Sequence, residues 1–597
     1  MERDIRRDGR SMLRCAGAAA SGVMTRRGFG RTAGLLAAGA TLLPGLGGGF
    51  GRAAAAVRLM LAVNQAGYLP RHPKQAFLAG PAAAGDVSVV EEASGRTVAS
   101  VPVGGSRRDP DTGLQVATVD FSAVRRPGRY WLQADGVQSH GFVVDDLAFD
   151  LAFVAMLRTY WLQRCGTAVR DPATGVAHAA CHQDDGVILH GDRFNPAGTR
   201  IDARGGWHDA GDFGKYVATA TTTIGRLLSL YEMQPALFGD GQLSIPESGN
   251  GAVDLLDEMA WGLDWLLRMQ RADGAVYRKL SGAQWPGDVL PESDRQTRYV
   301  YGVASPETAK FAAVMAMAAR IWRPAGAVYL DAARRAWAWL ETVPEQQVDW
   351  RAGDDAGSGM YLYNPPLDGE ETLRHDRDDR TWAAAELYVT TGEAPFQRAF
   401  AALLPRTDFT LFEWKDPSSL GLTSYLFAPR LDDRAGLRPA IRQKLLARAD
   451  QLLRRAASAP WGLAIERLKW GSNKMVAEEG IALVLAHRLT GRADYLAAAV
   501  GQLDYLLGRN PFERSFVTGV GADPVRHIHH RVLQAQGIYV PGYLAGGPFP
   551  GATDPVAPKG RGLLSWVDDA RSYATNENAI DYNASMIGLV GLLMSTP

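Results

Sequence analysis

Apolar residues along the chain change their spacing near residue 146. Before that point they alternate with polar residues in short runs, and turn residues such as Ser94-Gly95 and Pro127-Gly128 separate the runs. Short alternating runs at fairly even spacing predict a small all-β sandwich of immunoglobulin type over residues 57–144. We expect strands in these ranges: 58–63, 86–90, 114–121, 128–132 and 141–144.

From residue 146 onward, apolar residues recur at intervals of three and four, which is the spacing of amphipathic helices. The expected helices are 147–164, 213–232, 252–270, 306–322, 328–341, 380–391, 395–404, 437–456, 475–490, 493–507 and 577–594. Some are apolar all round, as in Phe311–Ala318, which is typical of a helix packed on two sides. With no convincing strand between them, these helices exclude a doubly wound α/β fold. The pattern indicates eleven or twelve helices, and an even set of about twelve that alternate between an inner and an outer ring predicts an all-α (α/α)6 barrel over residues 145–597. Periodicity alone also allows an α-solenoid.

The first 56 residues have the pattern of an export signal. A basic stretch leads to the pair Arg26-Arg27, an apolar run follows over residues 33–50, and small residues at 53–56 offer cleavage sites. Twin arginines before a modest apolar segment predict a Tat-type signal peptide over residues 1–56. The protein is then exported, to the periplasm or beyond it. A membrane anchor is the alternative, but the uncharged run is short and rich in Gly, and no later stretch is suited to span a bilayer.

Composition narrows the class of partner. The chain is 46% hydrophobic and 21% charged, with 64 basic residues against 64 acidic ones. This balance argues against a nucleic acid or an anionic membrane bound by bulk charge, and it suits a neutral ligand. Once the signal is removed, Cys165 and Cys181 are the remaining cysteines. In an exported protein, two cysteines suggest one disulfide by default.

Two carboxylate clusters lie in long connections between helices. One is residues 205–216, which contain Asp209 and Asp212, and the other is residues 566–584, which contain Glu577. Glycoside hydrolysis needs one carboxylic acid to protonate the leaving oxygen and a second carboxylate to activate water or to attack the sugar. Read alone, the same acids are equally suited to cap helices or to sit in their first turns.

Together, these segments resemble glycoside hydrolase family 9, the family of many cellulases. Residues 205–217, GGWHDAGDFGKYV, are similar to the DAGD segment of that family, and residues 515–531 resemble its histidine signature, with Asp523 as the one visible departure. The resemblance extends over residues 57–597, because residues 63–68 look like the opening of the immunoglobulin-like domain found in one subgroup. The terminal segment matches the acid signature of the family at Trp566, Asp568, Tyr573, Glu577, Ala579, Asn583 and Ala584.

The resemblance implies a role for each acid. Asp212 would be the general base, Asp209 would help to hold the attacking water, and Glu577 would be the general acid. An acid that stays protonated near neutral pH needs a drier or more anionic setting than the base. Inversion needs the two carboxyl groups about 6.5–9.5 Å apart, so that a water fits between base and sugar.

Further site residues follow from the same resemblance. His529 and Arg531 would contact sugar hydroxyls near the cleavage point. Asp568 would support the catalytic site around Glu577 or His529, and Trp207, beside the catalytic segment, is a candidate for binding substrate.

Two cysteines and two histidines provide a candidate metal site. Cys165, Cys181, His182 and His208 make a complete tetrahedral ligand set for structural zinc, although their spacing is longer than that of a zinc finger. The resembling subgroup carries structural zinc at these positions. The alternative is a Cys165–Cys181 disulfide with two ordinary histidines. The family also implies calcium, for which the acidic stretches 245–250 and 376–379 are unassigned candidates.

The sequence therefore predicts an inverting hydrolase of β-1,4-linked glucan, an endoglucanase acting on cellulose or a related β-glucan. Within the family, the alternative is an exo-β-glucosaminidase on chitosan oligosaccharides, which needs an acidic group for the substrate amine. From other classes, a non-catalytic carbohydrate-binding protein and a polysaccharide lyase are disfavoured by the paired acids and the neutral charge. We expect a monomer without a nucleic-acid partner, and without a membrane partner after signal removal.

Overall fold

A computed structural model describes residues 59–80, 85–365 and 368–596. The signal peptide expected at residues 1–56 lies outside these ranges. None of the helices within the described ranges combines the length and the apolar character that crossing a bilayer requires.

The first part of the described chain is a β-sandwich, as predicted. Its strands follow the order β1-β2-β5-β4-β3-β6-β7, and β8 pairs with β6. The sequence pattern located five of them and missed β2, β4 and the two-residue β7. The strands are β1 (Met60–Ala62), β2 (Gln75–Gly80), β3 (Asp86–Glu91), β4 (Thr97–Arg108), β5 (Gln115–Asp120), β6 (Gly128–Ala134), β7 (Val137–Gln138) and β8 (Phe142–Val144).

Strand β4 connects the two layers of the sandwich. Its first half pairs with β3 and its second half with β5, with a change of register between Val103 and Ser106. The two glycines inside this irregularity, at 104 and 105, are typical of a bulge where a strand bends. The ring of Tyr68 packs edge to face against Phe121 and against Phe142 inside the sandwich.

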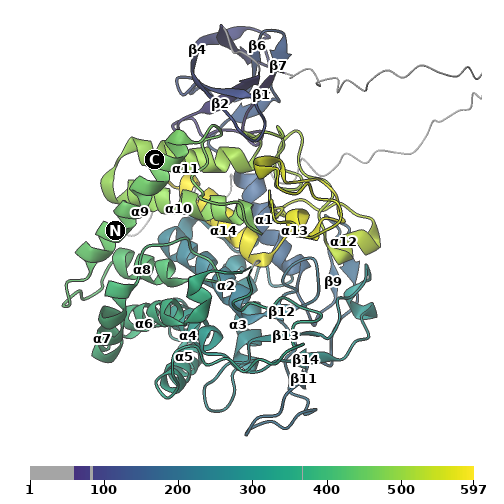
Figure 1. Ribbon diagram of the computed structural model, residues 1–597, viewed down its shortest axis with the longest axis vertical. Helices are drawn as coiled ribbons and strands as arrows, with labels where there is room; N and C mark the ends of the chain where they lie inside the picture. Colours follow the sequence, from purple (N-terminus) through teal and green to yellow (C-terminus); the bar gives the residue numbers. More distant parts are fainter. Residues whose placement is uncertain (1–58, 81–84, 366–367, 597) are drawn as a thin grey trace, which may run out of the picture. The chain divides into compact units, whose positions relative to one another are not determined.

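The rest of the chain is an (α/α)6 barrel, which confirms the predicted fold class (Figure 1). In the described part of the chain, six helices form the inner ring: α2 (Val217–Met233), α4 (Ser305–Ile321), α6 (Arg377–Thr391), α8 (Ser418–Phe427), α10 (Ser472–Thr490) and α14 (Ile580–Met594). Six more lie outside them: α1 (Asp150–Leu162), α3 (Asp254–Arg268), α5 (Ala327–Leu340), α7 (Ala394–Leu403), α9 (Arg438–Ser458) and α11 (Ala493–Leu506).

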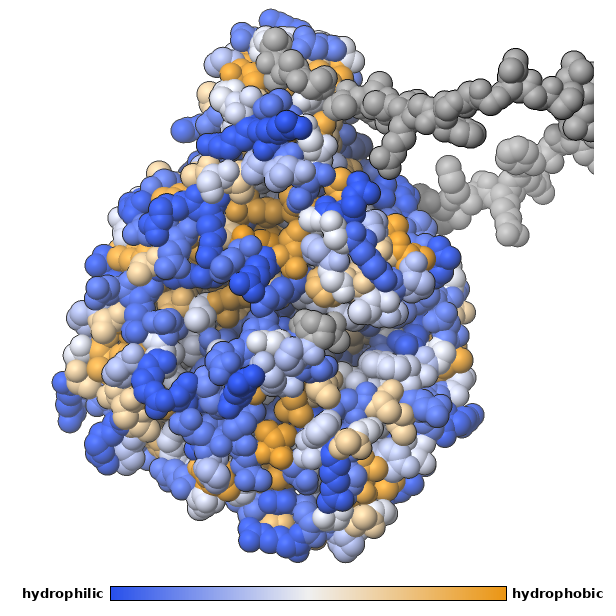
Figure 2. Space-filling model, viewed as in Figure 1, coloured by the Kyte–Doolittle hydropathy of each residue, from blue (hydrophilic) through white to orange (hydrophobic). Residues whose placement is uncertain are grey.

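Burial explains the composition of each ring. Helix α4 is buried over Ser305–Ala319, and from Phe311 to Ala319 its sequence is apolar on every side. The outer helix α9 buries only Ile441, Leu445, Ala449 and Leu452, which recur at the spacing of one helix face. The face shown in Figure 2 is accordingly mostly hydrophilic, with apolar side chains in separate small areas.

The last inner helix closes the barrel against the first elements. Helix α14 lies beside α1, α2 and α10. The Tyr160 hydroxyl donates to the Ile580 carbonyl at 2.8 Å, and the Asn583 side chain donates to Thr159 at 2.9 Å. Closure brings the connection before α2 and the connection before α14 to the same end of the barrel.

Two features differ from the sequence prediction. The inner helix α8 was not expected, because its sequence SSLGLTSYLF is short and rich in residues of low helix propensity. The expectation of no strand among the helices was wrong, since short strands line the loop end of the barrel: β9 (Val169–Arg170), β10 (Ala177–His178), β11 (Val187–Ile188), β12 (Lys215–Tyr216), β13 (Lys279–Gly282) and β14 (Arg298–Val300). The connections also contain α12 (Arg531–Gln536), α13 (Tyr573–Asn576) and the 3-10 helices η2 (Pro235–Leu237), η3 (Pro291–Ser293), η4 (Glu371–Arg374), η5 (Leu404–Arg406) and η6 (Gly562–Leu564).

Candidate active site

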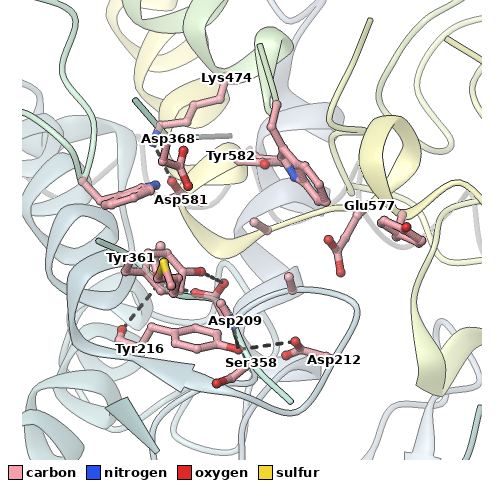
Figure 3. Close-up of a pocket in the computed structure, with 18 of the residues that line it drawn as sticks. Asp209, Asp212, Tyr216, Ser358, Tyr361, Asp368, Lys474, Glu577, Asp581 and Tyr582 are labelled. Atoms are coloured by element: carbon pink, nitrogen blue, oxygen red, sulfur yellow. Dashed lines mark hydrogen bonds and ion pairs between the residues drawn. The ribbon is translucent and has the colours of Figure 1, made fainter. Parts of the chain in front are cut away.

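A cavity of about 730 Å³ lies at the loop end of the barrel. The three acids singled out in the sequence, Asp209, Asp212 and Glu577, all line it (Figure 3). Aromatic side chains form much of the remaining wall: Tyr216, Trp285, Tyr361, Trp414, Trp470, Tyr573 and Tyr582. Aromatic faces beside carboxylates suit a neutral, ring-shaped ligand such as a sugar.

The segment before α2 holds Asp212 in a tight turn. The backbone N–H of Asp209 donates to the Gly214 carbonyl at 2.9 Å, and the Gly214 N–H donates to Asp212 Oδ1 at 2.7 Å. The Tyr216 hydroxyl donates to the other carboxylate oxygen, Oδ2, at 3.4 Å. Both oxygens of Asp212 therefore have a donor that limits the rotation of the side chain.

Asp209 is slightly more buried than Asp212, with 3% of its surface exposed against 6%. Thr219 donates to its Oδ1, and the Tyr361 hydroxyl donates to its Oδ2 at 3.1 Å. Burial, followed by the charge of Asp581, raises the pKa of Asp209 well above its ordinary value. The carboxyl group is thus anchored at both oxygens and disfavours a negative charge.

Glu577 reaches the same cavity from the connection before α14. Its Oε1 accepts the backbone N–H of Gly211 at 3.1 Å. Burial, followed by the nearby charge of Asp212, raises the pKa of Glu577 well above its ordinary value. A carboxyl group that keeps its proton near neutral pH beside an ionisable partner has the properties of a general acid.

Gly211 allows these segments to meet. A Cβ atom at this position would lie 2.4 Å from the His529 carbonyl oxygen and 2.9 Å from Glu577 Oε1. The Arg531 N–H donates to the Gly211 carbonyl at 3.0 Å, and the His529 N–H donates to the Asn576 carbonyl at 3.0 Å. Three distant segments are therefore joined through backbone groups around one glycine.

His529 and Arg531 line the cavity, as the sequence predicted. His529 Nδ1–H donates a hydrogen bond to the Ala570 carbonyl at 2.7 Å, so in the neutral ring Nε2 is the nitrogen without a proton. Burial lowers the pKa of His529, which favours this neutral form. Arg531 Nε donates to the Pro286 carbonyl at 2.7 Å, so the guanidinium group has a fixed direction.

The two other predicted site residues are not among those that line the cavity. Asp568 accepts the backbone N–H groups of Arg526 and His527 at 3.1 and 2.8 Å, and thus holds the loop that leads to His529. The prediction that Trp207 binds substrate was wrong: its side chain is 2% exposed, and its Nε1 donates to Glu258 at 2.8 Å. An indole packed inside the barrel in this way has no face to offer a sugar in the cavity.

The predicted metal ligands form one cluster. Cys165, Cys181, His182 and His208 each offer one atom, and the four atoms lie within 4.8 Å of one another. The distances are 3.5 Å from Cys165 Sγ to His182 Nδ1, 3.8 Å from Cys181 Sγ to His208 Nε2, and 3.4 Å between the two histidine nitrogens. A tetrahedron with Zn–S of about 2.3 Å and Zn–N of about 2.0 Å has edges of about 3.5 Å between S and N and about 3.3 Å between two N. The donor set therefore fits a tetrahedral metal ion.

The surroundings of the cluster also fit a metal site. Both cysteines are free and buried, so the alternative disulfide is not formed. His182 Nε2 lies 3.7 Å from Asp294 Oδ2, the arrangement in which a carboxylate orients a ligating histidine. His208 is tied to α1 because its N–H donates to the Gln163 carbonyl at 2.8 Å.

The two acidic stretches considered for calcium are engaged in ion pairs. Glu247 Oε1 lies 2.9 Å from Arg164, and Asp376 Oδ1 lies 2.9 Å from Arg380. Within the described residues, the cysteine–histidine cluster is the one group of three or more His, Cys, Asp or Glu side chains whose ligand atoms lie close enough together to hold a metal ion. Calcium stays a prediction without assigned ligands.

Several polar residues that line the cavity were not predicted from the sequence. Asp355, Asp368, Lys474 and Asp581 come from four different connections or helix ends. Asp581 lies four residues after Glu577, in the first turn of α14, and this proximity in sequence is the one signal that could have indicated it. Asp355 and Asp368 stand in loops whose sequence shows no pattern, and Lys474 lies in the first turn of α10.

Comparison with known proteins identifies the family of the chain. Residues 149–590 match the model of glycosyl hydrolase family 9, and residues 58–139 match that of the cellulase N-terminal Ig-like domain. An endoglucanase D of Acetivibrio thermocellus is 33% identical over 540 residues, which cover 88% of this chain and 82% of the relative. A xyloglucan-specific endo-β-1,4-glucanase of Bacteroides ovatus is 34% identical over 80% of this chain and 84% of its own length.

Solved structures show the same likeness. A metagenome-derived endoglucanase of glycoside hydrolase family 9 superposes with a TM-score of 0.84 at 41% identity, and the match covers 90% of this chain and 99% of that one. The endoglucanase J30 of the same family, solved as a Zn-binding triple mutant, gives a TM-score of 0.81 at 35% identity over 89% of this chain and 100% of that one. With its sandwich, its closed barrel and its three converging acids, the chain belongs to glycosyl hydrolase family 9.

Proposed function

We propose that the protein is an endo-acting β-1,4-glucanase that hydrolyses its substrate with inversion. The observation that carries this is the convergence of Glu577 with Asp209 and Asp212 on one cavity, across 366 residues between Gly211 and Glu577. The relatives are an endoglucanase and a xyloglucan-specific endo-β-1,4-glucanase, and their activities support β-1,4-glucan as the substrate class.

The protonation of the site supports a division of roles. Glu577, whose pKa is raised by burial, protonates the glycosidic oxygen of the leaving sugar. Asp212 takes a proton from a water as that water attacks the anomeric carbon from the opposite face. Asp209, anchored by Thr219 and Tyr361, holds the water in line. The neutral His529 and the fixed guanidinium of Arg531 contact hydroxyl groups of the sugars on either side.

The charges of the cavity disfavour the glucosaminidase alternative. Recognition of an amine requires a carboxylate that lacks a protein cation. Asp368 lies 2.5 Å from Lys415, Asp581 lies 2.6 Å from Lys474, and Asp355 is ion-paired with Lys279. Three of the four further carboxylates that line the cavity are thus already paired with a lysine. The fourth, Glu413, is buried, and burial raises the pKa of its carboxyl group, which disfavours the charged form that would bind an amine.

The metal cluster supports a structural zinc. Cys165, Cys181, His182 and His208 would hold the ion by both thiolates and two ring nitrogens. When bound, the ion supplies a rigid link and no chemistry at the sugar. His208 is covalently joined to Asp209, so the link restrains the catalytic segment at its N-terminal side.

The product profile tests the proposed activity. Purified protein should cleave cello-oligosaccharides and a soluble β-glucan at internal bonds, which lowers the viscosity of the polymer before much reducing sugar appears. It should release little glucosamine from chitosan oligomers. Release of single sugars from chain ends, with viscosity unchanged, would contradict endo action. Preferential cleavage of chitosan oligomers would select the glucosaminidase instead.

A further inference from the structure

The loop of residues 354–361 contacts both catalytic aspartates, directly or through one side chain. The Gly359 N–H donates to the hydroxyl oxygen of Tyr216 at 3.2 Å, and this hydroxyl donates to Asp212 Oδ2 at 3.4 Å. The Tyr361 hydroxyl donates to Asp209 Oδ2 at 3.1 Å (Figure 3). The two tyrosine rings pack with centroids 4.5 Å apart. The position of this loop therefore decides how both carboxylates are held.

The loop needs an anchor to keep this position. Tyr361 has a φ of 54°, in the left-handed region that a residue with a Cβ adopts at a cost of about 1–2 kcal/mol. Such a conformation persists only when surrounding contacts impose it. Trp350, which precedes the loop, is one of the exposed large side chains and donates to Asp355 at 2.5 Å. Its packing does not hold the loop from the solvent side.

Lys279 supplies this anchor from the barrel side. Its Nζ donates to Ser358 Oγ at 2.6 Å and to the Gly359 carbonyl at 3.0 Å, and it is ion-paired with Asp355. These contacts use all three donors of the ammonium group. The side chain is 1% exposed, so its charge has little access to water.

The contacts of Lys279 are connected to the catalytic base Asp212 through Gly359 and Tyr216. Lys279, on β13, is the register partner of Tyr216, on β12. Gly359 is held on both sides: its carbonyl accepts from Lys279, and its N–H donates to Tyr216. Arg278 adds a bond from Nη1 to the Met360 carbonyl at 3.2 Å.

We propose that Lys279 is a positioning residue for hydrolysis. It holds the loop 354–361 so that Tyr216 orients Asp212 and Tyr361 orients Asp209. The proposal rests on the proposed function, in which Asp212 is the base. Lys279 is not among the residues that line the cavity, and it acts through the two tyrosines.

Substitution of Lys279 by Met, which keeps the length of the side chain and removes its donors, tests the proposal. A shift of the loop of about 1 Å should lower kcat by about 10- to 100-fold, while KM changes by less than about 3-fold. Weaker hydrogen bonds to the base disfavour its ionised form. The acidic limb of the pH profile of kcat/KM should therefore move to higher pH, which simple loss of folded protein does not cause.

A second set of variants tests whether Lys279 acts through Tyr216 and Tyr361. In a Tyr216→Phe/Tyr361→Phe background, both hydrogen bonds to the aspartates are already absent, so Lys279→Met should lower kcat by less than about 3-fold further. The matched control is Lys74→Met in the β-sandwich. Lys74 is also buried, and its Nζ donates to the carbonyls of Pro70 and His72 at 2.8 Å each. It should lower thermal stability without moving the acidic limb.

Three outcomes would overturn the proposal: an unchanged kcat in Lys279→Met, a rise in KM alone, or a full additional loss in the double-phenylalanine background. If Lys279→Met does not fold, Arg278→Gln loosens the same loop more gently and should move the same limb. The proposed function is tested separately by Asp212→Asn, assayed in the same way. If that variant keeps its activity, the assignment of the base is wrong whatever Lys279 does.

Discussion

Replacement of Gly211 by Ala should disrupt the centre of the catalytic site. The new Cβ would lie 2.4 Å from the His529 carbonyl oxygen, whereas carbon and oxygen ordinarily approach to about 3.3 Å. Relief of the contact requires a movement of about 0.9 Å by the 209–212 segment or by His529. Glu577 Oε1, 2.9 Å from the same Cβ, would be displaced as well. A misplacement of about 1 Å lowers the rate by roughly 100-fold, or about 2.7 kcal/mol of activation free energy.

The assay is steady-state hydrolysis of a soluble cello-oligosaccharide, with calorimetry to measure the folded fraction. We expect kcat to fall by about 100-fold and the free energy of unfolding to fall by about 1–3 kcal/mol, as for other overpacked sites. Gly239→Ala is the matched control, because no heavy atom lies within 4 Å of the Cβ it would carry. It should leave kcat and stability nearly unchanged. If Gly211→Ala kept a kcat within about 3-fold of the parent, the close approach of the three segments would not control the reaction.

The other predictions concern the acid, the stereochemistry and the metal. Glu577→Gln should lower turnover on unactivated glucan by several orders of magnitude and spare glycosyl fluorides, whose leaving group needs no proton; similar losses on both substrates would contradict its role. Because burial raises the pKa of Glu577, activity should be present below that raised pKa and disappear as the pH rises through it; the fluoride substrate should lack this limb. Proton NMR in the first minutes should show the α-anomer as the first product, and an initial β-anomer would exclude inversion. Metal analysis should find one zinc per chain, and Cys181→Ser should lose it together with thermal stability and turnover; protein without stoichiometric zinc would refute the site.

The sequence predicted the architecture where local patterns agree with tertiary burial. Outer helices such as α9 show their buried face at helical spacing, and inner helices such as α4 contain a run that is apolar on every side, here Phe311–Ala319. Helix α8 shows neither of these two sequence patterns. Its Gly421 would place a Cβ 2.8 Å from the Cα of Trp382, so close packing against α6, and not helix propensity, explains its sequence.

The candidate site was predictable only in part. Asp209, Asp212, Glu577, His529 and Arg531 stand in segments whose composition is distinctive, and all five line the cavity. Trp207 stands in the same kind of segment but faces the barrel core, because adjacent residues of an irregular turn point in different directions. Lys279 and Ser358 could not be linked from the sequence, since their contact depends on the return of a long loop to β13.

The order of synthesis has a consequence for how the enzyme acquires activity. The bond between the Gly211 amide and Glu577 joins residues 366 positions apart. At 5–20 residues per second, a ribosome needs on the order of 20 to 70 s to pass from one to the other. During that interval the nascent chain already carries the four candidate metal ligands, Cys165, Cys181, His182 and His208, which lie within 44 positions of one another. The candidate metal ligands are therefore synthesised early, whereas the cavity is complete only after Glu577 has been added.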